Sequence, residues 1–329
     1  MEKTYHFSLE PYKGRATRHT CPNCGRKHCF AYYVDANGRP LSEITGRCDH
    51  ESKCGYHYKP SDFFRDHPDC KVDVSNVQPI QQPKRKDWFI PRGLVDTYRS
   101  NQSNLCKYLN DLYDETDVND TFPSIGYVYN LYQLGALING ETIFWQIDIN
   151  GKVRTGKVMQ YGPDGHRIKG DQDRITWMHT LLKRDKVIPE DFEIQQCFFG
   201  EHLLNIRPEA DVMIVESEKT AVVMANLFDD PIWLASGGKN GLNGEKMAVL
   251  KGRKIFLYPD ADAVSEWEEK AARFRELGYD CTVFDYAYRY TNEDVINHID
   301  PADIELHKWQ EYLYGIERER EEFFKNQQR

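Results

Sequence analysis

The sequence predicts a mixed α/β protein, in which a mostly parallel sheet flanked by helices follows an α+β middle region and a small cysteine-rich N-terminal unit. Three observations predict this order. Six of the nine cysteines lie within the first 70 residues. Between residues 206 and 290, short apolar runs alternate with stretches of helical periodicity, as in β-α-β units. Apolar residues make up 40% of the chain and charged residues 29%, which is typical of a globular protein with a real core.

Composition divides the 329 residues into five segments. The polar stretch 75–86 has two prolines and three glutamines and little to bury, so it is interpreted as part of a linker. In chain order we expect a cysteine-rich unit at 1–70, a linker at 71–86, a middle domain at 87–205, a sheet domain at 206–300 and a charged C-terminal helix and tail at 301–329.

The elements of the sheet domain can be predicted individually. Four apolar runs predict buried parallel strands, at 212–215, 231–235, 254–258 and 281–284. Ser217 is a candidate N-cap for a helix that carries residues 220–228. Apolar residues at helical spacing predict a second helix over 264–277, which Gly278 would end.

Hydropathy argues against a membrane-spanning protein, and charge argues against a protein that coats DNA nonspecifically. No run approaches ~18 apolar residues, and the N-terminus has no apolar stretch, so we expect no membrane span and a cytoplasmic protein. The net charge is −9, with 17 basic and 12 acidic residues in 1–100 and 26 basic and 40 acidic residues in the remainder. An acidic chain is not a nonspecific DNA coat, but its basic N-terminal part could contact nucleic acid.

Three acidic residues follow two of the predicted strands. Glu216 comes directly after the first strand, and Asp260 and Asp262 follow the third. Ligands bind beyond the carboxyl ends of parallel strands, and alternate residues share a face, so these side chains should converge. Oxygen ligands of this kind suit Mg²⁺ or Mn²⁺. Taken singly, each could instead be an ordinary loop acid or an acid that complements a helix dipole.

The cysteine spacing predicts a structural zinc site. Cys21 and Cys24 form one pair, Cys48 and Cys54 a longer one, and a predicted strand and turn lie between the pairs. These four are the preferred ligands, and the alternates are Cys29, His50 and His57. Nearby basic and aromatic residues could contact single-stranded DNA, or the aromatic ones could simply pack the hairpin: Arg15, Arg18, Arg26, Lys27, Tyr32 and Tyr33.

The middle domain contains a predicted hairpin over 142–159. Asn150-Gly151 is a strong signal for a type I′ turn. Several basic residues follow, among them Arg154 and Lys157. They could instead simply form a solvent-exposed face of the hairpin.

The motifs of the sheet domain resemble those of the Toprim family, which includes bacterial-type primases, topoisomerases and some nucleases. The resemblance rests on Val215-Glu216-Ser217-Glu218-Lys219-Thr220-Ala221, on Ser236-Gly237-Gly238, and on Tyr258-Pro259-Asp260-Ala261-Asp262-Ala263, and it covers about residues 210–290. It implies metal-dependent phosphoryl transfer by Glu216, Asp260 and Asp262. Lys219 matches a lysine of primase-like members and is a candidate catalytic residue.

The order zinc ribbon, basic middle region and Toprim domain is similar to that of primases of phages, plasmids and mobile elements, especially Zn-ribbon and Toprim proteins of Bacteroidetes elements. This wider resemblance covers most of residues 15–290. It implies that basic and glycine-rich positions bind the nucleotide or its phosphates, and the candidates are Arg154, Lys157, Gly237, Gly238 and Lys239.

The leading hypothesis is a DNA primase that makes short RNA primers on single-stranded DNA from nucleotide triphosphates. One alternative is a Toprim nuclease, which would use the same carboxylates with water as the nucleophile. Another is an accessory protein that binds nucleic acid without catalysis. A topoisomerase is disfavoured, because Val264 stands where that family commonly carries a third acid and the chain is short. The sequence contains no Walker A motif, so a partner helicase would be a separate protein.

Overall fold

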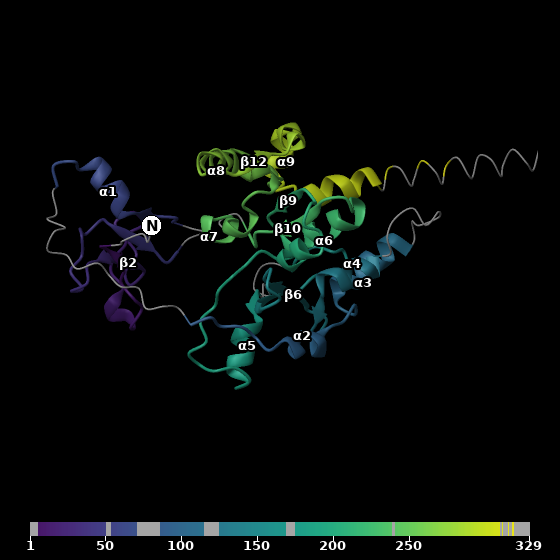
Figure 1. Cartoon of the computed structure of the whole chain (residues 1–329), viewed down its shortest axis with the longest axis horizontal. Coiled ribbons are helices and arrows are strands. Elements are labelled where there is room, and N and C mark those ends of the chain that lie inside the picture. The colour runs from purple at the N-terminus through teal and green to yellow at the C-terminus, as the bar shows by residue number, and fades with distance from the viewer. Residues whose placement is uncertain are drawn as a thin grey trace, which may run out of the picture. The chain divides into compact units, whose positions relative to one another are not determined.

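The computed structural model describes residues 6–50, 54–70, 86–114, 125–168, 175–238 and 241–309, together with the single positions 311, 315 and 318. The chain divides into two compact units, Met1–Lys86 and Asp87–Arg329 (Figure 1). Most of the predicted linker, residues 71–85, lies outside the described residues. The finer boundaries proposed from composition stay predictions.

The first unit is a small antiparallel sheet with the strand order β1-β2-β3-β4. Its elements are β1 Ser8–Leu9, β2 Phe30–Val34, β3 Gly46–Cys48, β4 His57–Tyr58 and helix α1 Pro60–Asp66. The register pairs Phe30 with Cys48 across β2 and β3. Its buried cluster consists of Phe30 and three cysteines, Cys21, Cys29 and Cys48, so sulfur atoms supply much of what a larger unit would build from aliphatic side chains.

The second unit begins with an antiparallel sheet in the order β5-β6-β7-β8. Its elements are α2 Arg92–Tyr98, α3 Asn104–Asp114, α4 Ile125–Tyr132, β5 Gly135–Ala136, β6 Thr142–Ile147, β7 Val153–Met159, β8 Thr176–Trp177 and α5 Met178–Arg184. Strands β6 and β7 pair along their length, which confirms the predicted hairpin.

The turn of this hairpin differs from the type I′ turn that Asn150-Gly151 predicts. That turn needs positive φ at both residues, but only Gly151 has it, at 76°. The reason lies in Asp148. Its carbonyl accepts a hydrogen bond from the amide of Gly151, and its Oδ1 accepts from the amides of Asn150 and Lys152, at 2.9 Å each. This side chain caps a longer loop, so the predicted turn type was wrong.

The later part of the second unit contains a fully parallel sheet in the order β10-β9-β11-β12, which confirms the predicted fold class. The four predicted strands and two predicted helices all form, within one or two residues of their expected bounds. The elements in chain order are β9 Val212–Val215, α6 Glu218–Leu227, β10 Ile232–Ala235, α7 Gly244–Met247, β11 Lys254–Leu257, α8 Val264–Glu276, β12 Asp280–Val283 and α9 Asn292–Ile296. Two of them, the short helices α7 and α9, were not predicted. A further helical stretch covers residues 301–309.

Local chemistry explains where these elements begin and end. Ser217 caps α6 as predicted, because its hydroxyl accepts a hydrogen bond from the amide of Thr220 at 3.1 Å. Gly278 follows α8 with a φ of 84°, a conformation that glycine adopts without strain. All four residues of β9 and all four of β10 are buried, which explains why both read as continuous apolar runs.

The strand order places a topological switch point between β9 and β11. From β9 the chain passes through α6 to β10 on one side, and from β11 it passes through α8 to β12 on the other (Figure 1). Because such crossovers are right-handed, the two helices cover opposite faces of the sheet. In open parallel sheets ligands bind at such a switch point, beyond the carboxyl ends of the strands, which here are the ends of β9 and β11.

A single large buried cluster joins the parallel sheet to the preceding segment. It contains residues of α3 and α4, such as Leu105 and Tyr132, together with β9, β10 and α8, where Trp267 is fully buried. Tyr132 also donates a hydrogen bond from its hydroxyl to the carbonyl of Trp233 at 2.7 Å. Segment 87–205 is thus packed directly on the parallel sheet.

Candidate functional site

The three predicted acidic residues lie at the switch point. The β9–β11 ladder continues past the last paired residues, because the amide of Tyr258 donates to the carbonyl of Ile214 at 2.8 Å. On the other side of β9, the amide of Gly237 donates to the carbonyl of Glu216 at 3.0 Å. The side chains of Glu216, Asp260 and Asp262 therefore leave neighbouring strand ends at one edge of the sheet.

Asp260 lies in a buried and acidic environment. Burial raises the pKa of this carboxyl well above its usual range, and the charges of Glu216, Asp300 and Asp262 raise it further. Asp260 Oδ1 is buried and accepts no hydrogen bond from the described residues. Glu216 is only 8% exposed. A buried group of like charges with an unsatisfied oxygen is the environment that a bound cation relieves.

Asp262 lies at the rim of this group. Its side chain is 35% exposed and its Oδ2 is 3.2 Å from Nδ1 of His298. His298 has a φ of 53°, which is unusual for a residue other than glycine, and it lies just before the C-terminal helical stretch.

Two further carboxylates, which the sequence analysis did not identify, lie at the site. Asp300 accepts a hydrogen bond from the hydroxyl of Thr220 in α6 at 3.0 Å. Asp300 and Asp303 also accept from each other's amides, at 3.0 and 3.2 Å, as a cap for the helical stretch that starts at residue 301. The only sequence signal is Asp-Pro-Ala-Asp, which reads as a helix start, and nothing local indicates that it packs against a segment 80 residues away.

Lys219, predicted from the family motif, lies in this acidic neighbourhood. The Nζ atom of Lys219 is 3.9 Å from Oδ1 of Asp303. Burial and the charge of Asp303 raise the pKa of Asp300, and the charge of Lys219 lowers it, so that the net shift of this pKa is upward. The structure thus brings Lys219 together with the carboxylates.

The glycine loop after β10 lies beside the carboxylates and is held by two buried lysines. Lys157, on β7, donates from Nζ to Glu218 Oε2 at 3.0 Å and to the carbonyl of Gly237 at 3.2 Å. Lys246, on α7, donates to the carbonyl of Ser236 at 2.8 Å. Gly237 and Gly238 have φ values of 87° and 135°, which explains the glycines. Lys239 lies outside the described residues.

Lys246 is the second feature that the sequence did not reveal. It is only 6% exposed, and burial lowers its pKa. In sequence it is one lysine in a short polar segment, and only the fold shows that its ammonium is turned inward onto the loop.

Arg154 is not brought to the carboxylates. It is separated from Lys157 by three positions on β7, so the two side chains leave opposite faces of the strand. Its guanidinium forms ion pairs with Asp148 and Asp87 and donates to the carbonyl of Trp88 at 2.9 Å. These partners hold it at the Asp87 edge of the second unit.

The donor set fits a hard divalent cation with water in its coordination sphere. Among the described residues, the groups whose ligand atoms all lie within 4.8 Å of one another are cysteine-containing groups, so Glu216, Asp260 and Asp262 do not form a closed cage. Mg²⁺ needs no such cage, because it keeps several waters and usually takes one or two carboxylates. Asp260 Oδ1, which is buried and accepts no hydrogen bond from the described residues, is available as a ligand.

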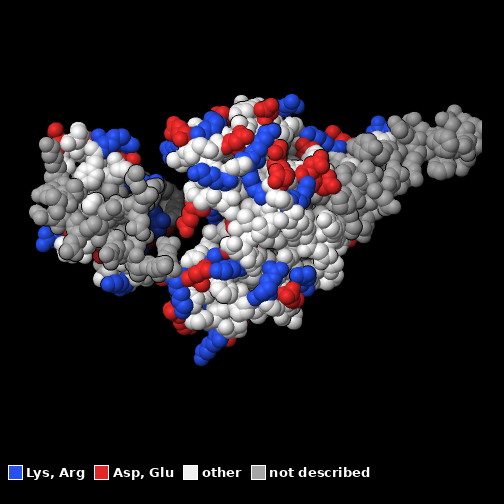
Figure 2. Space-filling view, in the orientation of Figure 1, with Lys and Arg blue, Asp and Glu red and all other residues white. Residues whose placement is uncertain are grey.

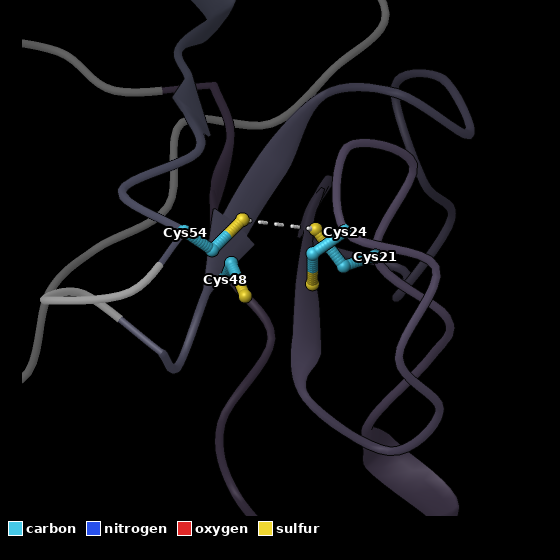
Figure 3. A group of neighbouring side chains, drawn as sticks. All are labelled: Cys21, Cys24, Cys48 and Cys54. Atoms are coloured by element: carbon cyan, nitrogen blue, oxygen red, sulfur yellow. Dashed lines mark hydrogen bonds between the residues drawn. The ribbon is translucent and has the colours of Figure 1, made fainter.

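The N-terminal unit holds a second candidate metal centre (Figure 3). The Sγ atoms of Cys21, Cys24, Cys48 and Cys54 lie within 4.8 Å of one another, and those of Cys21 and Cys54 are 3.7 Å apart. The two pairs come from the loop before β2 and from the end of β3 with the loop that follows it. The four preferred ligands are therefore together, as a structural zinc site requires.

Of the three alternate ligands, two lie in a possible metal-binding group and the third does not. Cys29 and His50 form a group with Cys24 and Cys48, again within 4.8 Å. His57 belongs to neither group. Its ring stacks on Tyr33, its Nε2 is 2.9 Å from the Tyr33 hydroxyl, and burial lowers its pKa to about 4.

Basic and acidic side chains are interspersed over the face of the second unit drawn in Figure 2. The face drawn there therefore has no uniform positive field. The described part of the chain contains no helix long and apolar enough to cross a membrane.

The Lys157–Glu218 pair supports a testable stability prediction. The two side chains are 10% and 1% exposed, so removing one partner leaves the other charge buried. We expect Lys157→Met to lower the free energy of unfolding by about 3–5 kcal/mol. The double variant Lys157→Met, Glu218→Met should recover most of that loss in urea unfolding. Equal loss in both variants would show that the ion pair is not the cause.

Comparison with known proteins gives two family matches. Residues 103–261 match a family described as a domain of unknown function, DUF6371. Residues 5–69 match the zinc β-ribbon finger family, which agrees with the cysteine cluster and with a structural zinc ion. No curated protein matches the chain.

Several solved structures are similar at low identity, and three of them are primases. The primase fragment of the bacteriophage T7 primase-helicase protein is 14% identical, with a TM-score of 0.36 over 85% of this chain and 98% of that one. A DnaG catalytic core is 13% identical, with a TM-score of 0.40 over 69% and 77%. The RNA polymerase domain of Mycobacterium tuberculosis primase DnaG, bound to a double-stranded DNA oligomer with an overhang, is 12% identical, with a TM-score of 0.41 over 68% and 76%. At these identities and scores the likeness assigns no activity to this chain.

Proposed function

We propose that this chain is a primase-type nucleotidyltransferase that makes short RNA primers on single-stranded DNA from nucleotide triphosphates. The observation that carries the proposal is the group of carboxylates at the β9–β11 switch point, where Asp260 is buried among like charges. These residues belong to the motifs that resemble the Toprim motifs of primases. The zinc-ribbon unit is a second argument for a nucleic acid template.

We assign the carboxylates of Glu216, Asp260 and Asp262 to the binding of Mg²⁺ or Mn²⁺. A bound ion of this kind would neutralise triphosphate charge and activate the attacking hydroxyl. The protein's own contribution is to fix these oxygens on two neighbouring strand ends. The hydrogen bond from Gly237 holds the backbone of Glu216, and the buried environment strengthens every electrostatic interaction at the site.

The nucleotide phosphates would lie on the side of the glycine loop. Lys157 is placed there by its bond to Gly237, and we propose that Lys157, Gly237, Gly238 and Lys239 contact phosphate. Lys219 would balance the charge of the carboxylates from α6 as a catalytic residue. Arg154 remains a proposed phosphate contact, and it would have to release Asp87 or Asp148 to act as one.

The N-terminal unit would engage the single-stranded template through basic and aromatic side chains. We further propose that strand separation comes from a separate helicase, and that the chain acts in the cytoplasm of a bacterial or phage-infected cell, as in mobile genetic elements. Its clustered thiols suit a reducing compartment.

The experiment that tests this function incubates the full chain with single-stranded DNA, Mg²⁺ or Mn²⁺ and labelled ribonucleotide triphosphates. We expect short labelled oligomers from the wild type and none from the variant Asp260→Ala, Asp262→Ala. Metal-dependent shortening of the DNA without oligomers would replace the primase by a nuclease. DNA binding with neither product would indicate an accessory protein.

A further inference from the structure

The N-terminal unit offers more metal ligands than one zinc ion can use. One group of four consists of Cys21, Cys24, Cys48 and Cys54, and a second consists of Cys24, Cys29, Cys48 and His50. In each group all ligand atoms lie within 4.8 Å of one another. The two groups share Cys24 and Cys48, and together they contain six different side chains. A tetrahedral zinc ion takes four.

The separations between sulfur atoms match the edges of zinc tetrahedra. With a zinc–sulfur bond of about 2.3 Å, two thiolates on one tetrahedral ion lie about 3.8 Å apart. Cys21 and Cys54, which belong only to the first group, are 3.7 Å apart. Cys48 Sγ is 3.9 Å from Cys29 Sγ and 3.9 Å from Nδ1 of His50, which belong only to the second. Each group thus contains ligand pairs at about the separation that a shared zinc ion would give them.

The backbone fixes the second group as firmly as the first. Cys29 immediately precedes β2, where Phe30 pairs with Cys48, and the amide of Asp49 donates to the carbonyl of Cys29 at 2.7 Å. The carbonyl of His50 accepts from the amide of Cys54 at 2.9 Å, which ties the ligands of both groups to one loop. Cys29 is 3% exposed, so its sulfur is directed into the unit and not to solvent.

We propose that this unit binds two zinc ions in one cluster, with the thiolates of Cys24 and Cys48 bridging them. Cys21 and Cys54 would complete the first ion, and Cys29 and His50 the second. Each ion then has four ligands, and the thiol protons pass to solvent as the ions bind. Five thiolates and two dications leave one negative charge, whereas four thiolates around one ion leave two. The proposal goes beyond the primase function and does not rest on it.

The simpler account makes Cys29 an uncharged buried thiol. Its Sγ donates to the carbonyl of Arg26 at 3.2 Å, a contact that satisfies a neutral thiol. That account predicts one zinc ion per chain, and it predicts no role for His50. The two accounts therefore differ in a number that can be counted.

The test measures zinc per chain by mass spectrometry of the full-length protein, purified with zinc and freed of loosely bound ions. We expect two ions in the wild type and one in the variant Cys29→Ser, His50→Ala. Cys70→Ser is the matched control, because Cys70 is an exposed cysteine outside both groups, and it should keep two ions. One ion in the wild type overturns the proposal. Two ions that persist in the double variant also overturn it, because the second would then lie elsewhere.

A spectroscopic measurement on the wild type covers the case in which the double variant does not fold. After exchange of zinc for ¹¹³Cd, a cluster with bridging thiolates should give two cadmium resonances that are coupled to each other. A single resonance, or two resonances without coupling, contradicts the shared ligands.

Discussion

Replacing Asp260 by asparagine is expected to lower Mg²⁺-dependent primer synthesis at least about a hundredfold. A bound metal ion supplies several kcal/mol of charge stabilisation in the transition state, and each 1.4 kcal/mol is a factor of ten in rate. Asparagine keeps the shape of the side chain but removes the charge that holds the cation. The measurement is the initial rate of primer synthesis at saturating nucleotide, with Asp280→Asn, an exposed acid at the start of β12, as the control.

The same substitution is expected to make the metal-free protein more stable. In the folded chain the pKa of Asp260 is raised, so its ionised form is disfavoured and ionisation costs stability. This cost grows as the pH rises from the ordinary carboxyl range near about 4 toward the raised pKa, and it is absent below that range. Asp260→Asn should therefore melt above the wild type at pH 7 without divalent ions, and at the same temperature in acid. A lower melting temperature at pH 7 would show that Asp260 is not held among repelling charges.

The second large effect concerns zinc. Removing metal, or replacing Cys48 by serine, is expected to unfold the first unit, because metal binding contributes on the order of ten kcal/mol to a segment of this kind. The buried cluster of the unit is largely made of the ligands themselves, so little core remains without the ion. The second unit has its own large core and should melt as before.

Limited proteolysis with zinc analysis checks this expectation. Cleavage should become rapid within residues 6–70 of Cys48→Ser, while a resistant fragment that begins near residue 87 persists. The control Cys70→Ser should behave as the wild type. A Cys48→Ser chain that resists cleavage in its first unit would contradict a structural role for zinc.

The parallel sheet could be predicted because its signals are local. Strands β9 and β10 are buried throughout, so their sequences are short apolar runs, and Ser217 and Gly278 mark helix ends by hydrogen-bond and backbone chemistry. The position of Glu216, Asp260 and Asp262 at one edge of the sheet could also be predicted, because parallel strands end at the same edge. The cysteine spacing predicted the first ligand group in the same way.

The remaining parts of the site depend on long-range packing. Asp300 joins the carboxylates only because the chain returns to Thr220 after 80 residues, and Lys246 matters only because α7 turns its ammonium onto the carbonyl of Ser236. The pairing of Arg154 with Asp87 spans 67 residues. No pattern in a single sequence encodes such contacts. The turn type predicted for Asn150-Gly151 was wrong for a different reason. The side chain of Asp148, two residues before Asn150, determines the conformation of this turn.

The most direct test of the central claim is to measure manganese binding by electron paramagnetic resonance in the zinc-loaded, full-length protein. The wild type is expected to bind Mn²⁺ and to weaken the free-ion signal. Asp260→Asn and Glu216→Gln should bind at least tenfold more weakly, and Asp280→Asn should bind as the wild type does. Unchanged Mn²⁺ binding in both Asp260→Asn and Glu216→Gln would contradict the claim that the carboxylates at the β9–β11 switch point hold the catalytic cation.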